Sequence, residues 1–395
     1  MKNIYNSIVF LRVDFNVPII DGVILDDKRI NDALPTILNL LKNHNKIILA
    51  SHFGRPRGFD KSLSLKPIYD YLCKKLNPYQ LFFSEKIDNS YYQLVSELNF
   101  GEILMLENLR FYSEEESCDE NFMKFLAKPA DYYCNEAFSC SHRAHASIMM
   151  GKFFDPNHKF LGYLFQKEIN TIDNFLKNKT GKSIAIIGGS KISSKIHLLS
   201  SLQTKVDSIF VVGAMANTLL KYKGIEVGQS LVEDNCDKMI EDLLYNSEEN
   251  NCDIILPDDF VVTGNIENPI YIKKTNLVDK NDVIVDIGEN SISALSELLK
   301  KCDSVLWNGP AGVFEVKPFE EGTLKIAQLI ADLTEQGAVQ SIVGGGDTIA
   351  AINDDNLLNK LTHVSTAGGA FLEYIEQDGN LVGIDVINRM VFYFK

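Results

Sequence analysis

Short apolar runs alternate with amphipathic segments along the whole chain. The runs are rich in β-branched residues and cover residues 8–13, 46–51, 102–107, 132–137, 183–189, 208–213, 253–259, 282–288, 304–309 and 341–346. Between them, segments such as 64–76 and 319–334 repeat apolar residues at helical spacing. Nearly continuous apolar strands are typical of parallel sheets that helices cover on both faces. The pattern therefore predicts the α/β class.

The length of the chain predicts two domains. A chain of 395 residues exceeds the size at which one hydrophobic core keeps growing. The helical pattern of residues 165–177 leads into the polar segment 178–182, and the next apolar run begins at residue 183. We therefore expect a hinge helix and linker over residues 165–182.

Composition narrows the class of protein. Hydrophobic residues make up 45% and charged residues 23%, as in an ordinary globular protein. No apolar run reaches the roughly 18 residues that span a bilayer, and the start lacks a basic region followed by an apolar stretch, so we expect a cytoplasmic protein. The net charge of -14 opposes binding to nucleic acid or to an anionic membrane. The seven cysteines form no C-x-x-C pair, so we expect reduced, mostly buried thiols.

The arginines are few and unevenly placed. Of the 39 basic residues only seven are arginines, at positions 12, 29, 55, 57, 110, 143 and 389, and six of these fall in the first 143 residues. Arginine offers phosphate and carboxylate a rigid bidentate fork. Scattered surface ion pairs are the alternative explanation, but the clustering favours an anion site in the first half.

Polar residues follow the apolar runs of the first half. In open parallel sheets, ligands bind at the carboxyl ends of the strands. The residues found after these runs or at the following helix start are Asp14, Asn16, Arg29, His52, Arg55, Arg110 and Arg143. Taken singly, each could be a turn former or a surface charge. Together they predict a pocket for a small, multiply charged anion, with Asp14 and Asn16 recognising a hydroxyl.

The second half carries glycine-rich turns with charged residues. We expect Gly188-Gly189-Ser190-Lys191 to end a strand and open a helix, which would put Lys191 and Lys195 on one helical face near bound phosphate. Gly344-Gly345-Gly346-Asp347-Thr348 repeats the arrangement, and Asp347 could hold Mg²⁺ or merely cap the helix. Asn308 and Glu315 lie in the segment WNGPAGVFE (307–315). A P-loop NTPase is excluded, because Leu176 stands where the phosphate loop needs its first glycine. The absence of G-x-G-x-x-G disfavours a dinucleotide enzyme or a protein kinase, and the absence of G-x-S-x-G means that there is no nucleophile elbow.

The ordered set of motifs resembles the phosphoglycerate kinase family. The motifs are RVDFNVP (12–18), SHFGRP (51–56), ENLRF (107–111), SHRAHAS (141–147), GGSKISSK (188–195), WNGPAGVFE (307–315) and GGGDT (344–348). The resemblance spans nearly the whole chain. It implies two doubly wound, Rossmann-like parallel-sheet domains joined by a hinge helix: residues 1–164 plus about 380–395, which bind 3-phosphoglycerate, and residues 183–379, which bind the nucleotide.

The resemblance also implies the site residues. Phosphoglycerate would be bound by Asp14, Asn16, Arg29, His52, Arg55, Arg110 and Arg143. The nucleotide would be bound by Gly189, Lys191, Lys195, Gly213, Asn308, Glu315, Gly344, Gly345, Gly346, Asp347 and Thr348. Asp347 would hold Mg²⁺, and Arg29, Lys191 and Lys195 would be catalytic. We expect a monomer whose partners are ATP or ADP and 3-phosphoglycerate or 1,3-bisphosphoglycerate.

Four positions depart from the family's usual pattern. Glu136 and Ser139 stand where Asp and Gly are usual, Ala214 replaces a glycine after residues 208–213, and Ala367 replaces the first glycine of a late STGGGA motif. None of these changes removes a charged group from the expected chemistry.

Two other functions stay open at this point. One is a different kinase that forms an acyl phosphate on another small carboxylate, and a substrate profile would distinguish it. The other is a non-catalytic nucleotide-binding protein, which the presence of Lys191, Lys195 and Asp347 disfavours. The expected acceptor is a carboxylate with a pKa near ~4, so it is ionised at neutral pH and requires no general base.

Overall fold

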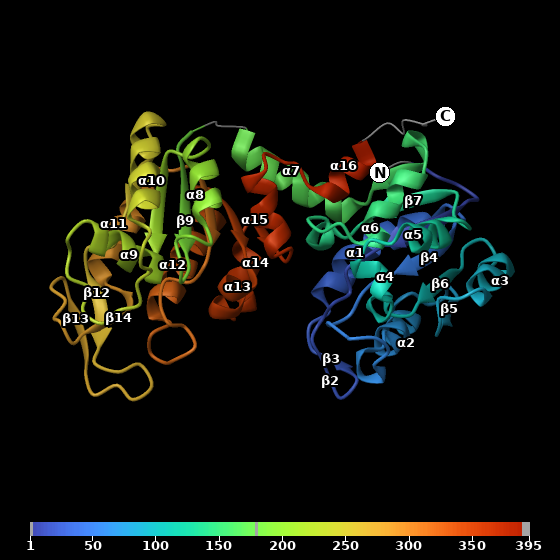
Figure 1. Ribbon diagram of the computed structural model, residues 1–395, viewed down its shortest axis with the longest axis horizontal. Coiled ribbons are helices and arrows are strands. Elements are labelled where there is room, and N and C mark those ends of the chain that lie inside the picture. Colours follow the sequence, from blue (N-terminus) through green and yellow to red (C-terminus); the bar gives the residue numbers. More distant parts are fainter. Residues whose placement is uncertain (1–2, 178–180, 389–395) are drawn as a thin grey trace. The chain divides into compact units, whose positions relative to one another are not determined.

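The computed structural model describes residues 3–177 and 181–388 and has α/β architecture (Figure 1). It divides into two compact units. The first contains the described residues up to Asn170 and from Asn380 onward, and the second contains those from Thr171 to Gly379. Each unit has its own six-stranded parallel sheet, so the predicted fold class of two parallel-sheet domains is confirmed.

The sheet of the first unit has the strand order β5-β6-β4-β1-β7-β8. Its strands are β1 (Ile8–Arg12), β4 (Lys46–Ala50), β5 (Leu81–Ser84), β6 (Ile103–Leu106), β7 (Tyr132–Asn135) and β8 (Lys159–Leu161). The chain builds from β1 toward one edge and then returns to place β7 on the other side of β1. This creates a topological switch point between β1 and β7, which is where such sheets bind ligands.

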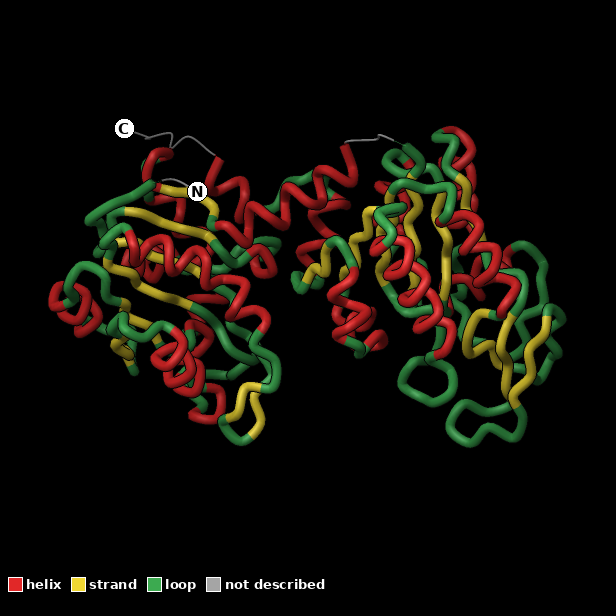
Figure 2. Tube along the Cα trace, turned by 180° about the vertical axis from the view of Figure 1, so that it is seen from behind, coloured by secondary structure: helices red, strands yellow, loops and turns green. Residues whose placement is uncertain are grey.

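Helices cover both faces of this sheet (Figure 2). They include α1 (Lys28–Lys42), α2 (Lys66–Lys75), α3 (Ser90–Glu97), α4 (Ser113–Glu116), α5 (Glu120–Ala127) and α6 (Ala146–Met149), with short 3-10 turns such as η2 (Leu109–Phe111) and η3 (Phe138–Cys140). A hairpin of β2 (Ile19–Ile20) and β3 (Val23–Ile24) precedes α1. Successive strand residues face opposite sides, so Leu11 and Leu49 join one core layer while Phe10 and Ile48 join the other.

The sheet of the second unit has the order β11-β10-β9-β15-β16-β17. Its strands are β9 (Ser183–Gly188), β10 (Ser208–Val212), β11 (Asp253–Ile255), β15 (Ser304–Asn308), β16 (Gln340–Gly344) and β17 (His363–Ser365). Its helices are α8 (Ile196–Gln203), α9 (Ala214–Tyr222), α10 (Asp237–Glu249), α11 (Glu289–Leu299), α12 (Glu321–Glu335), α13 (Gly346–Ile352), α14 (Asp355–Lys360) and α15 (Gly369–Glu376). The switch point lies between β9 and β15, and the fully buried Trp307 anchors β15 in the core.

Two predicted strands of this unit form, but one lies in a different sheet and the other is shorter than predicted. The run 282–288 forms β14 (Val283–Ile287), which belongs to a separate antiparallel sheet with β12 (Phe260–Thr263) and β13 (Ile272–Thr275). The run 253–259 forms a strand only to Ile255, because Pro257 has no N–H to continue the ladder. An apolar run predicts a strand, but it does not encode the direction of its neighbours.

Helix α7 (Tyr163–Lys177) contains the boundary between the two units. Its first turn is held by the first unit, since Glu136 accepts hydrogen bonds from the Leu164 and Phe165 amides at 3.1 and 3.2 Å.

Helix α16 (Val382–Asn388) packs against α6 and β8. Residues 178–180 of the predicted linker and the tail from Arg389 onward lie outside the described residues. The hinge over residues 165–182 stays a prediction.

The seven cysteines are all free, and Cys134, Cys140, Cys236 and Cys252 are buried. None of the helices in residues 3–177 and 181–388 has the length and apolar character needed to cross a bilayer.

Candidate functional site

Asp14 lies at the switch point of the first sheet, directly after β1. Ser139, in the loop after β7, donates a hydrogen bond to its carboxylate. The carboxylate also accepts a 2.7 Å hydrogen bond from Arg29 Nη1 and a 3.0 Å bond from the Asn16 amide. Burial opposes ionisation of Asp14, but Arg29, Ser139 and the Asn16 amide outweigh it and hold the pKa of Asp14 below its usual range. Asp14 is therefore a fixed anion that orients Arg29.

A turn after β4 carries His52 and Arg55. The Asn16 side chain accepts a 2.9 Å hydrogen bond from the Gly54 amide and so ties this turn to the β1 loop. Gly54 has a φ of +61°, and a side chain there would meet Leu63 at 2.8 Å, so the turn requires glycine. Arg110 donates a 2.6 Å hydrogen bond to the Gly54 carbonyl oxygen, whereas Arg55 is exposed on the same turn.

Three arginines act on one another: Arg12 at the end of β1, Arg110 in η2 and Arg143 after η3. Burial, followed by the charges of Arg12, Arg110 and Arg143, lowers the pKa of His145 to about 4. Burial together with Arg12 and Arg143 also lowers the pKa of Arg110, against the opposing effects of Cys140 and Glu116. Such mutual repulsion requires that these guanidinium groups lie near one another. Arg110 and Arg143 of the predicted anion site therefore lie near Arg12 and His145, whereas Arg55 is exposed and its part in the site stays a prediction.

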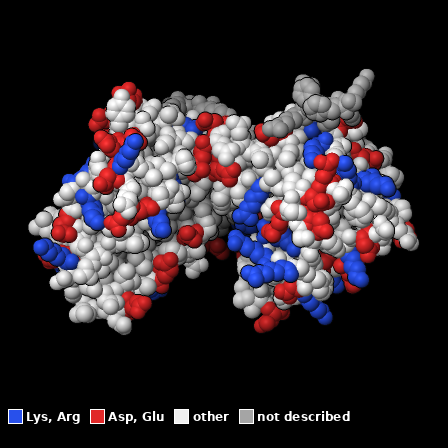
Figure 3. Space-filling view, viewed as in Figure 1, with Lys and Arg blue, Asp and Glu red and all other residues white. Residues whose placement is uncertain are grey.

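Figure 3 shows how basic side chains gather over the α1 side of the first unit, while acidic ones are distributed more widely. A local cationic surface of this kind can attract an anionic ligand against an unfavourable net charge.

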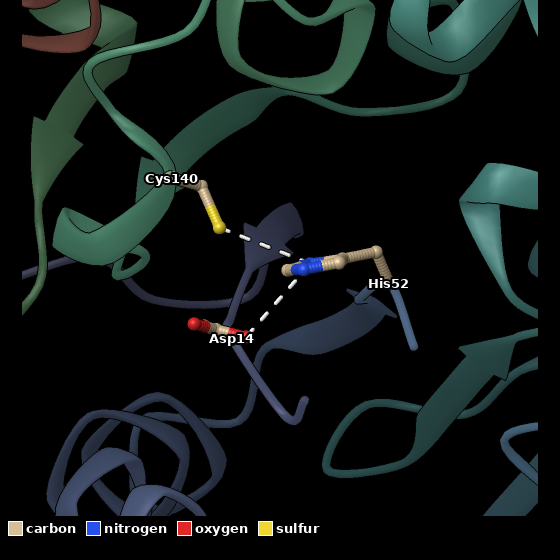
Figure 4. Close-up of side chains that lie close together, drawn as sticks. All are labelled: Asp14, His52 and Cys140. Atoms are coloured by element: carbon tan, nitrogen blue, oxygen red, sulfur yellow. Dashed lines mark hydrogen bonds and ion pairs between the residues drawn. The ribbon is translucent and has the colours of Figure 1, made fainter. Parts of the chain in front are cut away.

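Asp14, His52 and Cys140 could be taken for a metal site. Their potential ligand atoms lie within 4.8 Å of one another, and the Asp14 carboxylate and Cys140 thiol approach the same imidazole (Figure 4). However, Arg12 donates to that imidazole at 3.2 Å, and Arg110 also acts on it electrostatically. Fixed positive charges disfavour a cation there. The cluster is therefore better suited to an anion.

Lys195 occupies the switch point of the second sheet. Its Nζ donates a hydrogen bond to the Gly188 carbonyl oxygen at the end of β9 and a 2.5 Å bond to Asn308 Oδ1 at the end of β15. Burial lowers the pKa of Lys195 to about 8, and the charge of Asp347 opposes this effect. Lys195 therefore spans the crevice between the two strands.

The predicted helix after Gly188-Gly189 is wrong. Helix α8 begins at Ile196, so Lys191 and Lys195 lie on the preceding loop and do not share a helical face. Lys191 is exposed, whereas Lys195 is half-buried. The loop is held instead by Glu233, which accepts a 3.0 Å hydrogen bond from the Ser193 amide.

The turn from Gly344 to Thr348 is fixed by Asn308. The Asn308 amide donates a 2.7 Å hydrogen bond to the Gly344 oxygen, and a side chain at Gly345 would lie 2.4 Å from that amide nitrogen. The Thr348 hydroxyl donates a hydrogen bond to the Gly344 carbonyl oxygen and accepts one from the Gly309 amide. The hydroxyl therefore has a donor and an acceptor within the protein. Gly345 is the cap residue of α13, so the interpretation of Asp347 as a helix cap is wrong. The Asp347 carboxylate is exposed.

A cavity of about 650 Å³ opens beside these loops. Of the predicted nucleotide residues, Gly189, Gly213, Glu315 and Asp347 line it. Buried Asp286 also lines it and accepts a 2.6 Å hydrogen bond from the Gly322 amide at the start of α12. Neither Asp286 nor Arg12 was among the predicted site residues. Each is a charged residue within an apolar run of the sequence, and this position is the feature by which it could have been found.

Comparison with known proteins identifies the family. The family model described as phosphoglycerate kinase matches residues 2–378. The chain belongs to the phosphoglycerate kinase family. A phosphoglycerate kinase of Wolbachia pipientis wMel is 42% identical over 378 residues, which cover 95% of this chain and 94% of the relative. A phosphoglycerate kinase of Dictyoglomus turgidum is 41% identical over 370 residues, which cover 93% of this chain and 92% of the relative.

A solved structure supports the same family. Phosphoglycerate kinase from Coxiella burnetii matches with a TM-score of 0.87 and 34% identity, covering 98% of this chain and 97% of that one. As a phosphoglycerate kinase, the chain is a phosphotransferase that acts on small molecules in glycolysis. Membership of this family disfavours a different acyl-phosphate kinase and a non-catalytic protein.

Proposed function

We propose that the first unit binds 3-phosphoglycerate or 1,3-bisphosphoglycerate and that the second binds ATP or ADP with Mg²⁺. The observation that carries this assignment is the chemistry at the two switch points. At the first, Arg29 and His52 lie beside Asp14, and the charges of Arg110 and Arg143 act on His145, which suits a small acid with a phosphate. The second combines Lys195 with a cavity beside glycine-rich loops.

The proposed binding modes follow from the available donors and acceptors. Arg55, Arg110, Arg143 and His52 meet the phosphate and carboxylate, while Asp14 and Asn16 meet the hydroxyl. On the second unit, the exposed carboxylate of Asp347 at the cavity offers the hard oxygen ligand that Mg²⁺ prefers. When bound there, Mg²⁺ neutralises charge on the phosphate oxygens.

The reaction then needs alignment and charge stabilisation. A carboxylate oxygen of 3-phosphoglycerate forms a bond to the γ-phosphorus of ATP, while the bond from that phosphorus to its bridging oxygen breaks and the electron pair leaves with ADP. No proton moves, because the acceptor is already ionised. Arg29, Lys191 and Lys195 stabilise the charge on the transferring oxygens, and the reverse reaction uses the same groups.

The two ligands would be bound by different units, so transfer requires that the sites come together. We propose that the segment 165–182 acts as the hinge for this closure, which also excludes water from the acyl phosphate. Solution scattering of the protein with both substrates should show a smaller radius of gyration than without them. We further propose a cytoplasmic monomer, and sedimentation equilibrium would detect an oligomer.

Separate binding measurements test the assignment of ligands to units. Calorimetric titration of Arg110→Met should show loss of 3-phosphoglycerate binding with unchanged affinity for ADP. Asn308→Ala should show the reverse. A folded Arg110→Met protein that loses ADP binding and keeps 3-phosphoglycerate binding would contradict the assignment.

A further inference from the structure

Arg12 is a fully buried arginine at the end of β1, and the proposed reaction gives it no contact with substrate. Its guanidinium makes three hydrogen bonds. Nε donates to Ser147 Oγ at 2.7 Å, Nη1 donates to the Val13 carbonyl oxygen, and Nη2 lies 3.2 Å from His52 Nδ1. All three nitrogens of this side chain are thus directed at defined protein acceptors.

The bond to His52 fixes which imidazole nitrogen carries the proton. A guanidinium has only donors and stays protonated in proteins, so Nδ1 of His52 must be the acceptor. An imidazole that accepts at Nδ1 is neutral and carries its hydrogen on Nε2.

The other neighbours of Nδ1 are compatible with this arrangement. Asp14 Oδ1 lies 3.8 Å away, which is too long for a hydrogen bond, and Asp14 is engaged by Arg29 and Ser139. Cys140 Sγ also lies 3.8 Å away, and burial raises the pKa of its thiol, so that it keeps its hydrogen. Burial holds the pKa of His52 well below its usual range, with Asp14 opposing and Arg12, Arg110 and His145 contributing.

A buried counter-charge holds Arg12 in place. The fully buried carboxylate of Glu115 accepts bonds of 2.9 and 2.6 Å from the amide and hydroxyl of Ser147, the residue that accepts from Arg12 Nε. The chain Glu115–Ser147–Arg12–His52 therefore runs from the core to the candidate site, and each link is a hydrogen bond. Removing one member of such a buried hydrogen-bonded chain is costly, because it leaves a buried polar or charged group without a partner.

We propose that Arg12 is a positioning residue that keeps His52 neutral with its proton on Nε2, so that His52 presents an uncharged hydrogen-bond donor to phosphoglycerate. This inference rests on the proposed phosphoglycerate site. A neutral histidine can donate a hydrogen bond to the ligand. Unlike a protonated ring, it adds no further positive charge that would repel the neighbouring arginines. Through Arg12, buried residues of the core thereby determine which nitrogen of His52 carries the proton at the edge of the sheet.

Nuclear magnetic resonance of histidine labelled with ¹⁵N tests the inference on the ligand-free protein. Signals of His52 are identified by their loss in His52→Gln. At pH 6.5 the long-range proton–nitrogen couplings should show a neutral ring with the hydrogen on Nε2. A ring protonated on Nδ1 or on both nitrogens would overturn the inference, and this measurement requires no variant of Arg12 to fold.

A double variant then tests the role of Arg12 itself. Arg12→Met with Glu115→Gln removes the donor and its counter-charge together, and circular dichroism checks the fold. We expect His52 to titrate at a higher pH than in the wild type and the KM for 3-phosphoglycerate to acquire that titration, while Arg12→Lys restores the Nε2 form. A purely structural role would lower the melting temperature and leave the tautomer unchanged, which would refute the inference.

The two proposals fail in distinguishable ways. Absence of 3-phosphoglycerate binding would contradict the proposed site, whereas the His52 tautomer is measured without any ligand.

Discussion

The Nζ atom of Lys195 lies 2.5 Å from Oδ1 of Asn308, across the switch point of the second sheet. Asn308 in turn donates to the Gly344 carbonyl oxygen. The cation and the glycine-rich turn are therefore connected by one amide side chain. A cation held in this way needs little reorganisation when charge develops on a transferring phosphoryl group.

Removal of this cation should slow the chemical step. We expect Lys195→Ala to lower kcat by roughly 10²–10³, the scale for loss of one preorganised charge-stabilising group. Steady-state kinetics at saturating substrates measure the change. Lys300→Ala is a matched control, because Lys300 is exposed just after α11 and pairs with the exposed Glu297. An unchanged kcat in Lys195→Ala would refute the proposed role.

Lys195 should also make nucleotide binding depend on pH. In the free protein its pKa of about 8 means that the ammonium loses its proton as the pH rises through about 8. The anionic phosphates of ADP favour the charged form. We therefore expect ADP affinity to fall above about pH 8, by up to about tenfold per pH unit, with uptake of up to one proton.

Calorimetry in buffers of different ionisation enthalpy measures that proton uptake. Lys195→Met should abolish it. The same uptake in wild type and in Lys195→Met would assign the effect to another group.

Two buried carboxylates should make stability fall as the pH rises. Burial raises the pKa of Glu136 and of Asp286 to about 7 each, although backbone amides of Leu164 and Phe165, or of Gly322 and Ile287, partly compensate. Unfolded carboxylates titrate near ~4. Between about pH 4 and 7 the folded state therefore binds more protons, and the free energy of unfolding decreases by up to about 1.4 kcal/mol per pH unit for each group.

Chemical denaturation across this range measures the slope. Glu136→Gln and Asp286→Asn should each make the slope less negative, whereas Glu297→Gln, on the exposed face of α11, should not. Identical slopes in wild type and both buried variants would mean that these carboxylates are ionised in the folded protein throughout.

Arg29 should matter to transfer more than its neighbour Lys28. Asp14 holds the Arg29 guanidinium at 2.7 Å, whereas Lys28 pairs with Asp32 on the exposed face of α1. We expect Arg29→Met to lower kcat/KM for 3-phosphoglycerate by roughly 10²–10³, with little change in Lys28→Met. Equal effects of the two substitutions, measured by initial rates, would show that general surface charge rather than Arg29 is responsible.

The parallel strands were predictable because their residues are apolar on both faces. Residues 183–189 and 304–309 match β9 and β15 closely, and these runs are followed by the loops in which many of the expected nucleotide residues lie. The run 282–288 shows the limit, because five mostly apolar residues look alike in parallel and antiparallel sheets.

The local conformation of loops was less predictable. The segment after Gly188 was expected to be helical, but hydrogen bonds that Ser193 donates to the distant Glu233 hold it as a loop until Ile196. The contacts of Arg12 were equally unpredictable, since its partners Ser147 and Glu115 are more than 100 residues away in sequence. Long-range contacts of this kind leave no local pattern.

The most direct test of the account is a coupled assay of ATP consumption with 3-phosphoglycerate, glycerate or acetate as acceptor, with Mg²⁺ present or chelated. We predict turnover only with 3-phosphoglycerate and only with Mg²⁺ present, because Arg29 at Asp14 and the arginines that act on His145 are suited to an acid that carries a phosphate. Equal turnover with glycerate, or none with any acceptor from protein shown to be folded, would contradict it.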